Sequence, residues 1–390
     1  MISLSRKLII TKYNENILAF RFDENTATDI YSCNDESLIG NIYVGVVSDV
    51  VNNINAAFIT FKNGCKGYYP LNDNKPIYLN KKNNEKICQG DRILVQVTSD
   101  KIKTKDYTLS SNISFRGKYV VYTHNIPGIN ISKKISDNQK RNELKSLLED
   151  YNNDEYGFIL RTSCINASID AIKEEMNYFI ELFSKVVESA FHARVCNFIY
   201  GESSVLKRAK DACYKLIDEI IVDDEDIYEE LMQDEEIKQS EKVRLYSDAS
   251  YSLKKLYSLD TVLKDTMSKR VWLKSGAYLI IEHTEALHVI DVNTGKISHK
   301  GDKEQIFFKT NMEAASKICN EIRKRNLSGI IIIDFINMKN KEHYTELSVK
   351  MQKLLDNDEI SSTVVGFTNL GLMEVTRKRV NKPLFEVLNS

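Results

Sequence analysis

Two aspartates stand at the ends of apolar, strand-sized stretches in the last third of the chain. Asp291 follows the stretch LHVI at 287–290, and Asp334 follows four consecutive isoleucines at 330–333. A single helical pattern separates the two stretches, so both strand ends can be neighbours where a layered domain opens into a crevice. Asn293 lies two positions beyond Asp291 and therefore shares its strand face. The spacing predicts two carboxylates and one amide in a common site.

Such a group could bind a divalent cation. Two carboxylates a few ångströms apart repel each other unless a cation lies between them or one keeps its proton. Mg²⁺ takes oxygen ligands, usually one or two carboxylates with waters, and a substrate phosphate completes its shell. An ion held in this way can orient water for in-line attack on a phosphodiester. The alternative is that both acids cap turns or pair with basic residues, and the pattern alone does not decide between the two.

The elements around these acids predict a layered α/β domain. Residues 277–282 and 287–291 favour a hairpin, and an apolar stripe predicts a helix over 304–325. The β-branched run 329–334 is typical of a strand buried on both faces. A further helix over 343–355 and a strand at 363–367 follow, which completes an alternating strand and helix pattern.

The first two thirds of the chain have a different pattern. Residues 7–21 predict a hairpin, and short strands between 39 and 109 are spaced as in a small barrel. An apolar stripe at helical spacing predicts a long helix over 169–187, with Ser168 or Asn166 as its N-cap. The acidic section 223–241 is interpreted as a solvated helix face.

Composition excludes several protein classes. The 390 residues are 42% hydrophobic and carry a formal net charge of −1, so a sizeable core is feasible and a uniformly basic nucleic-acid coat is excluded. No segment reaches the roughly 18 apolar residues of a membrane helix. The seven cysteines form no Cys-x-x-Cys pair, which argues against a disulfide framework or a thiolate zinc site. We expect a cytoplasmic protein without a membrane partner.

Other motifs of catalysis are missing from the sequence. It contains no Walker-type phosphate loop, no Gly-x-Ser-x-Gly and no His-Glu-x-x-His. His283 and His288 are five positions apart in the expected hairpin, and we expect them to point to opposite faces rather than share a metal.

Between about residues 269 and 380, this chain contains long strings that resemble the catalytic region of the ribonuclease E/G family and follow one another in the same order. The matching strings are KSGAYLII (274–281), TEA (284–286), DVNTG (291–295), NMEAA (311–315), RNLSGIIIIDFINM (325–338), GLME (371–374) and TRKR (376–379). In that family the acids matching Asp291 and Asp334 bind the catalytic Mg²⁺, and the amide matching Asn293 assists at the scissile phosphate. The resemblance implies hydrolysis of single-stranded RNA that leaves 5′-phosphate and 3′-hydroxyl ends, in RNA processing and decay. Mn²⁺ is an alternative ion.

Upstream strings extend the resemblance over nearly the whole chain. IYVGVV (42–47), NAAFIT (55–60) and KGYYPL (66–71) look like the family's OB-fold RNA-binding domain. Phe58, Tyr68 and Lys105 match its RNA-contacting aromatic and basic positions, although each ring could equally belong to the barrel core. The string GFILRT (157–162) resembles the family's sensor for a 5′-monophosphate, which assigns phosphate contact to Arg161 and Thr162.

The resemblance implies an α+β multidomain fold. An OB-fold barrel (34–115) is inserted into a ribonuclease H-like subdomain (1–33 and 202–268). A 5′-sensor region (116–201) and a deoxyribonuclease I-like α/β catalytic domain (269–390) complete the expected organisation.

The chain departs from the family after the TRKR segment. The family continues into a Cys-Pro-x-Cys motif whose thiolates share zinc between subunits, whereas this chain reads NKPLFEVLNS at 381–390. We therefore expect no zinc, and a homodimer only without a zinc link. Beside the expected nuclease site, Arg377 and Lys378 are assigned to RNA contact. The alternatives are a non-catalytic RNA-binding protein or an accessory subunit in ribosome or transcript assembly.

Overall fold

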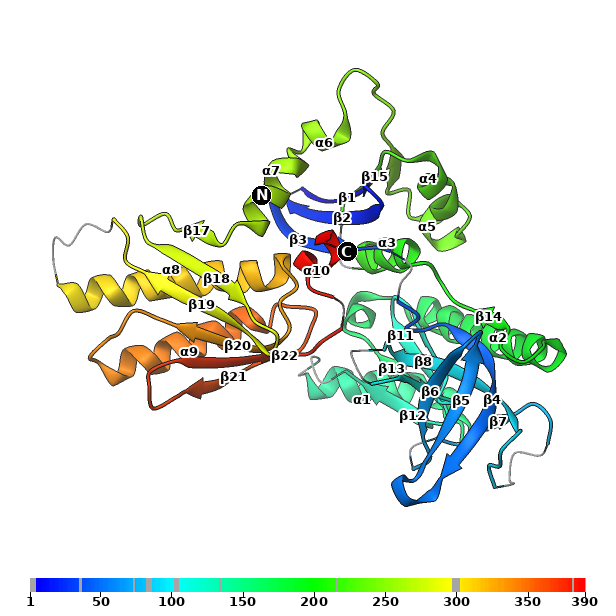
Figure 1. Ribbon diagram of the computed structural model, residues 1–390. Coiled ribbons are helices and arrows are strands. Elements are labelled where there is room, and N and C mark those ends of the chain that lie inside the picture. Colours follow the sequence, from blue (N-terminus) through cyan, green and yellow to red (C-terminus); the bar gives the residue numbers. More distant parts are fainter. Residues whose placement is uncertain are drawn as a thin grey trace. The chain divides into compact units, whose positions relative to one another are not determined.

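The chain forms two compact units. Unit 1 contains Met1–Asn34 and Arg208–Ser390, and unit 2 contains Asp35–Lys207, so the second unit is inserted into the sequence of the first. The computed structural model is shown in Figure 1. It describes residues 5–34, 37–72, 74–81, 86–101, 105–132, 135, 137–214, 217–296, 302–380 and 382–389.

The first sheet of unit 1 joins the start of the chain to its middle. In spatial order it contains β16 (Val243–Leu245), β15 (Glu219–Val222), β1 (Arg6–Tyr13), β2 (Asn16–Asp23) and β3 (Thr26–Ser32). The expected hairpin is confirmed, since β1 and β2 are antiparallel around a turn in which Asn14 has a φ of 54°. β15 pairs parallel to β1, and β16 pairs parallel to β15.

Helices pack on this sheet through apolar side chains. Leu253, Leu259 and Leu384 come from three different helices and share a core cluster with Ile9 and Phe20 of the sheet. In the acidic section, Asp224 and Asp234 cap helices, while the apolar side of each helix is buried. The helices of this region are α3 (Ser204–Tyr214), α4 (Glu225–Met232), α5 (Glu235–Gln239), α6 (Leu253–Leu256), α7 (Leu259–Met267) and α10 (Leu384–Asn389).

The second sheet of unit 1 confirms the expected layered α/β pattern. Its spatial order is β17 (Arg270–Trp272), β18 (Tyr278–His283), β19 (Leu287–Asn293), β20 (Gly329–Asp334), β22 (Met373–Arg377) and β21 (Ser362–Phe367). β19 and β20 are parallel, and the other neighbouring pairs are antiparallel. In sequence, α8 (Lys303–Lys324) connects β19 to β20, and α9 (Lys341–Leu355) follows β20.

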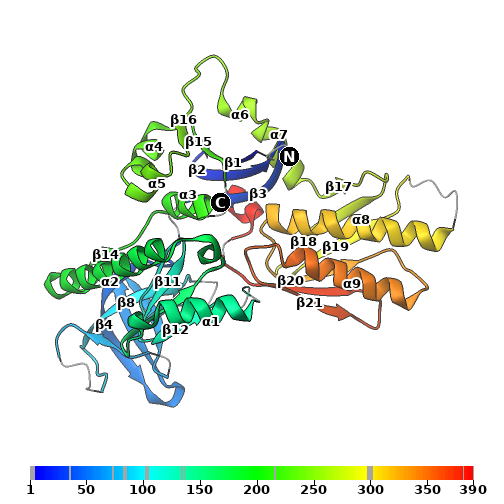
Figure 2. The same cartoon turned by 180° about the vertical axis from the view of Figure 1, so that it is seen from behind.

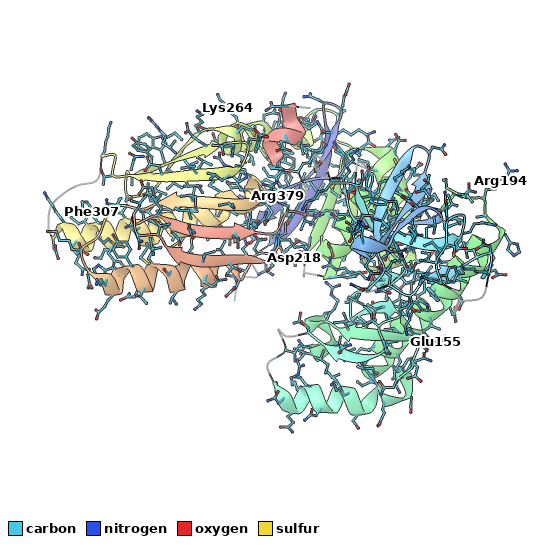
Figure 3. The ribbon with its side chains drawn as sticks, turned by 60° about the horizontal axis from the view of Figure 1, so that its bottom comes forward. Glu155, Arg194, Asp218, Lys264, Phe307 and Arg379 are labelled. Atoms are coloured by element: carbon cyan, nitrogen blue, oxygen red, sulfur yellow. The ribbon has the colours of Figure 1, made fainter. Side chains whose placement is uncertain are left out.

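Both helices cover the same face of this sheet. Figure 2 shows α8 and α9 in front of the strands, and Figure 1 shows the strands from the other side. In Figure 3 the label Phe307 marks α8. Ile331 and Ile333 are buried against the helices, whereas Ile330 is 49% exposed. The expectation that β20 is buried on both faces is therefore wrong, because its second face receives no helix from the described part of unit 1.

Unit 2 contains a closed β-barrel of the OB-like kind, as the strand spacing predicts. β4 (Ile42–Val51), β5 (Ala56–Lys62), β6 (Cys65–Pro70), β9 (Tyr107–Ser110) and β8 (Arg92–Ser99) follow one another around it, and β4–β8 pairing closes the ring. A Cβ at Gly45 would lie 2.5 Å from the Ile59 side chain, so glycine permits the tight interior there. The flanking elements are η1 (Asn52–Ile54), β7 (Ile77–Tyr78) and β14 (Phe198–Tyr200).

A smaller sheet with a long helix completes unit 2. Its strands, in spatial order, are β10 (Ser114–Arg116), β11 (Val120–His124), β13 (Tyr156–Leu160) and β12 (Gly128–Ile131). The expected long helix is α2 (Ile169–His192), capped by Ser168 and buried through Ile172, Met176 and Phe179. The remaining elements are α1 (Asn138–Leu147), η2 (Glu149–Tyr151) and η3 (Thr162–Asn166). Among the described residues, none of the helices combines the length and the hydropathy needed to cross a bilayer.

Candidate active site

The candidate active site lies at the carboxyl ends of β19 and β20. The two strands are parallel, and Asp291 and Asp334 are register partners. Because neighbouring strands lie about 4.8 Å apart, the two acids start from adjacent backbone positions at one edge of the sheet. The prediction that the two strand ends are neighbours is confirmed. Both side chains also point to the sheet face opposite to α8 and α9, since they alternate with the buried Ile290 and Ile333.

Asn293 joins this pair through a direct contact. Its amide Nδ2 donates a hydrogen bond of 2.7 Å to Oδ2 of Asp291, two residues earlier on the same strand face. This bond fixes the Asp291 carboxylate and leaves its other oxygen available to a ligand. The structure thus brings together all three residues of the expected catalytic group.

The electrostatics of the pair favour a cation. Although Asp334 is an exposed residue, desolvation of its carboxyl and, second, the nearby Asp291 charge raise its pKa above the usual range. The second cause is the like-charge repulsion that a bound cation would relieve. The donor set consists of carboxylate and amide oxygens, which suits Mg²⁺ better than a thiol-seeking or imidazole-seeking metal.

The described residues offer few further metal ligands. No cluster of three or more histidine, cysteine, aspartate or glutamate side chains with metal-binding geometry occurs among them. An octahedral ion held by two carboxylates and an amide has further positions for water and substrate. Mg²⁺ sites that act on phosphates commonly have this composition.

Two residues that the sequence reasoning missed hold the segment after Asp334. Asn311 on α8 is fully buried, and its amide both donates to the Ile336 carbonyl and accepts from the Ile336 N–H, at 2.7 and 3.1 Å. Glu304 accepts hydrogen bonds from the backbone N–H groups of Lys339 and Asn340. A polar side chain on the apolar stripe of the expected helix was the signal that could have identified Asn311.

The barrel places Phe58 and Tyr68 side by side. They are cross-strand partners on β5 and β6, with ring centroids 6.3 Å apart at 68°. Both rings are half-buried, whereas the alternating neighbours Ile59 and Tyr69 are fully buried. Ile59 and Tyr69 therefore form part of the barrel core, whereas the rings of Phe58 and Tyr68 lie partly at the surface. Lys105 is exposed.

Arg161 and Thr162 lie where β13 ends and η3 begins. The Arg161 guanidinium donates to the backbone carbonyl of Gly117, and its backbone N–H donates to the carbonyl of Tyr119. Thr162 is exposed beside it. The role of these two residues in phosphate contact stays a prediction.

Arg377 does not occupy the surface position expected of an RNA contact. It is 5% exposed, and its guanidinium donates to Asp358 at 2.8 Å, to the Asn326 side chain and to the Leu327 carbonyl. The reason is strand alternation, since Arg377 shares the buried face of β22 with Val375. The buried guanidinium has a structural role and is not exposed for RNA contact. Lys378, on the opposite face, is exposed.

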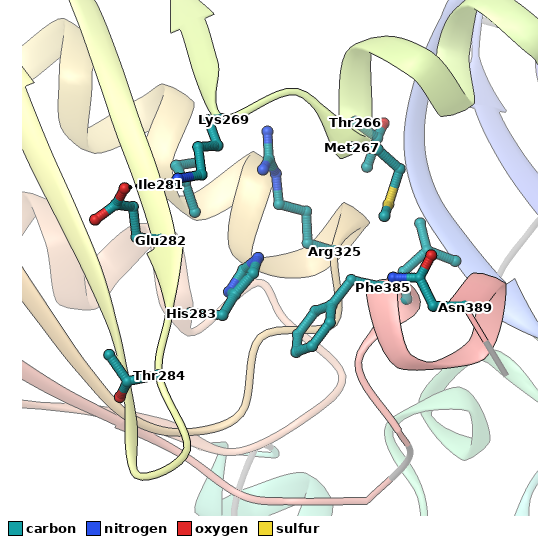
Figure 4. Close-up of a pocket in the computed structure, with 11 residues that line it drawn as sticks. Thr266, Met267, Lys269, Ile281, Glu282, His283, Thr284, Arg325, Phe385 and Asn389 are labelled. Atoms are coloured by element: carbon teal, nitrogen blue, oxygen red, sulfur yellow. Dashed lines mark hydrogen bonds and ion pairs between the residues drawn. The ribbon is translucent and has the colours of Figure 1, made fainter.

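The expectation that His283 and His288 point to opposite faces is wrong. They are cross-strand partners in the β18–β19 hairpin, with their Nδ1 atoms 3.0 Å apart. Figure 4 shows His283 beside Phe385, whose ring stacks on it at 4.2 Å, in a pocket of about 400 Å³ that Arg325 also lines. Both histidines follow the helix-covered face of the sheet, so this pocket is separate from the acids.

The chain is similar to known ribonucleases. The sequence profile described as the ribonuclease E/G family matches residues 114–380. Ribonuclease G of Haemophilus influenzae is 32% identical over 367 residues, which cover 90% of this chain and 74% of that protein. Ribonuclease G of Salmonella typhimurium is 30% identical with 90% and 75% coverage, and ribonuclease E of Synechocystis is 30% identical with 90% and 53% coverage. The chain belongs to the ribonuclease E/G family.

The buried Arg377–Asp358 pair yields a stability prediction. The two side chains are 3% and 4% exposed, so Asp358→Asn leaves an uncompensated buried guanidinium. We expect the free energy of unfolding to fall by about 3–5 kcal/mol, measured by urea denaturation. Glu282→Gln, which breaks the exposed pair with Lys269, is the matched control and should change stability little. Equal effects of the two substitutions would contradict the structural role of Arg377.

The histidine pair yields a pH prediction. Burial first, and then His288, lower the pKa of His283 from 6.5 to about 4, and burial also lowers the pKa of His288. As pH falls from about 6.5 to about 4, the histidines bind protons in the unfolded chain but stay neutral in the folded protein. The free energy of unfolding therefore decreases in this pH range. The double variant His283→Gln/His288→Gln should show a shallower loss of unfolding free energy across this range. An unchanged pH slope in urea titrations would contradict the assignment.

Proposed function

We propose that this protein is a metal-dependent endoribonuclease that hydrolyses single-stranded RNA at the edge of β19 and β20. The observation that carries the proposal is the in-register pairing of Asp291 and Asp334 on adjacent parallel strands, with Asn293 bonded to Asp291. Family membership supports the same reaction, because the similar proteins are named ribonuclease G and ribonuclease E.

In this proposal the residues of the chain hold and orient the reacting groups. Asp291 and Asp334 bind one Mg²⁺, for which Mn²⁺ could substitute, and Asn293 keeps the Asp291 carboxylate in its binding orientation. The bound ion would polarise the scissile phosphate and make an attacking water more acidic. The remaining amide capacity of Asn293 is available to the phosphate or the water. Attack of this water on the scissile phosphate would leave 5′-phosphate and 3′-hydroxyl ends.

Unit 2 is proposed to bind the RNA strand. Phe58 and Tyr68 provide adjacent rings on which unpaired bases can stack, and exposed Lys105 provides charge for the backbone. Lys378 provides a further exposed charge in unit 1. Stacking requires unpaired bases, which favours single-stranded substrates.

Arg161 and Thr162 are proposed to favour substrates with a 5′-monophosphate. A guanidinium offers paired N–H donors and a threonine offers a hydroxyl, a combination suited to a terminal phosphate. The closed barrel and the two sheets of unit 1 support the proposed OB-fold, ribonuclease H-like and deoxyribonuclease I-like parts. We propose a role in cytoplasmic RNA processing and decay, and any homodimer is proposed to lack a zinc link.

The acids can be tested by isosteric substitution. Asp291→Asn and Asp334→Asn each remove one metal-binding charge, and we expect cleavage of a single-stranded RNA to fall at least about 10²–10³-fold. Binding of the same RNA, measured by fluorescence anisotropy without divalent ions, should persist. Asp265→Asn, an exposed aspartate on α7, is the control and should cut normally.

A non-catalytic RNA-binding protein or an inactive accessory subunit would give a different result. Purified wild-type protein would then bind RNA and leave it intact with or without Mg²⁺. Wild-type cutting at full rate in excess EDTA would contradict the metal role of the acids.

The 5′-end preference can be tested with matched oligonucleotides that differ only in their terminal group. Wild-type protein should cut the 5′-monophosphorylated RNA faster than the 5′-triphosphorylated or 5′-hydroxyl RNA. Arg161→Gln and Thr162→Ala should reduce this ratio toward one, while cleavage of the 5′-hydroxyl RNA stays unchanged and serves as the internal control. A wild-type rate that is indifferent to the 5′ end would remove the sensor assignment and leave the nuclease proposal standing.

A further inference from the structure

An aromatic cluster lies on the same sheet as the candidate active site. Trp272 on β17 and Tyr278 on β18 are cross-strand partners, with ring centroids 5.3 Å apart and planes inclined by 59°. The Arg270 guanidinium lies 4.6 Å from the Tyr278 ring centroid and 5.8 Å from that of Trp272. Together these three side chains present two rings and one planar cation.

Strand register connects this cluster to the acids. Trp272 pairs with Tyr278, and Tyr278 pairs with Asn293. Two interstrand spacings of about 4.8 Å therefore separate the backbone of Trp272 from that of Asn293, roughly 10 Å in all. In the next row, Arg270 pairs with Ile280, which pairs with Asp291.

The cluster and the acids also share one face of the sheet. Val271 and Leu279, which alternate with the cluster, are 8% and 0% exposed and belong to the core beneath α8 and α9. Trp272 points the other way and is 54% exposed. Because this is the face on which Asp291 lies, the aromatic cluster and the carboxylates form one continuous surface.

A structural role does not account for this arrangement. The core side of β17 is already filled by Val271, and Trp272 keeps more than half of its surface open to solvent. Exposed apolar surface next to a polar site often marks a binding surface. The Tyr278 ring, inclined by 59° to the indole, and the Arg270 guanidinium border this exposed indole face.

We propose that Arg270, Trp272 and Tyr278 form a stacking platform for one nucleobase of the RNA strand, close to the scissile phosphodiester. This inference rests on the proposed nuclease function and adds a base subsite in unit 1 to the stacking rings of the barrel. Aromatic faces stack on any base, and the arginine can pack on a base plane or contact the adjacent phosphate. Because the platform and the acids belong to one sheet, a base bound there fixes which phosphate lies at Asp291 and Asp334.

A fluorescence experiment can detect the stacked base directly. Trp272 is the one tryptophan of the 390-residue sequence, so selectively excited indole emission reports on this position alone. The Asp334→Asn protein, with RNA binding verified by anisotropy, is titrated with a short single-stranded oligonucleotide. We expect RNA to quench the indole emission. Unchanged emission at saturating RNA would overturn the proposal.

A substitution cycle can then show that the platform contacts one base. Trp272→Ala should lower kcat/KM by about 5- to 150-fold, the loss expected for one stacked base, whereas Trp272→Phe should retain most of the activity. In a series of abasic substrates that each lack one base, the loss of one particular base should lower the kcat/KM of the wild-type protein by a similar factor. That abasic substrate should not impair Trp272→Ala further, because the same contact has already been removed.

Tyr251→Ala removes another exposed aromatic side chain of unit 1 and should cut at the wild-type rate. Wild-type kcat/KM in Trp272→Ala, or an abasic profile identical to that of the wild type, would overturn the platform and leave the nuclease function intact. A wild-type protein that binds RNA without cutting it would instead refute the proposed function, and indole quenching would still report on the platform.

Discussion

Repulsion between two carboxylates is the interaction on which the account of this protein depends. The parallel, in-register pairing of β19 and β20 forces Asp291 and Asp334 to neighbouring positions at one sheet edge. Folding thus brings like charges together, and the pKa of Asp334 is raised by desolvation first and by the nearby Asp291 charge second. Other features of unit 1 hold this arrangement in place, notably the α8 connection and the buried Asn311 amide that binds the chain at Ile336. In the proposed function, a divalent cation bound between the carboxylates would relieve this repulsion.

The one-sided covering of the sheet explains where the candidate active site is located in unit 1. Because α8 and α9 both pack on one face, the second face carries Ile330, Trp272 and the acids in exposed or half-exposed positions. The structural residues follow the covered face instead, and Arg377 is the clearest case, since a basic residue in a basic segment becomes a buried partner of Asp358. The same alternation that buries Arg377 turns Lys378 outward. In this sheet, the face on which a residue lies, more than its type, separates the proposed ligand-binding residues from those that stabilise the fold.

Much of this arrangement could be predicted from the sequence, because it depends on local periodicity and on strand ends. The β18–β19 hairpin, the helix containing Asn311 and the closed barrel follow from such patterns. Three expectations differ from the structure: two concern tertiary packing, and the third applied strand alternation across a hairpin. The run of isoleucines before Asp334 fits a strand with one or two covered faces, and tertiary packing decides which. His283 and His288 share a face because opposite residues in a hairpin do so, whereas alternation applies only along one strand. The burial of Arg377 depends on Asp358 and Asn326, which are distant in sequence.

The central claim is that Asp291 and Asp334 bind one divalent cation between them. The most direct measurement is a crystal structure of the wild-type protein with Mn²⁺, with the ion located by its anomalous scattering. The account predicts an ion about 2 Å from an oxygen of each carboxylate, and its loss in Asp291→Asn crystals. Two carboxylates that point apart, or an ion bound elsewhere with this edge of the sheet vacant, would contradict it.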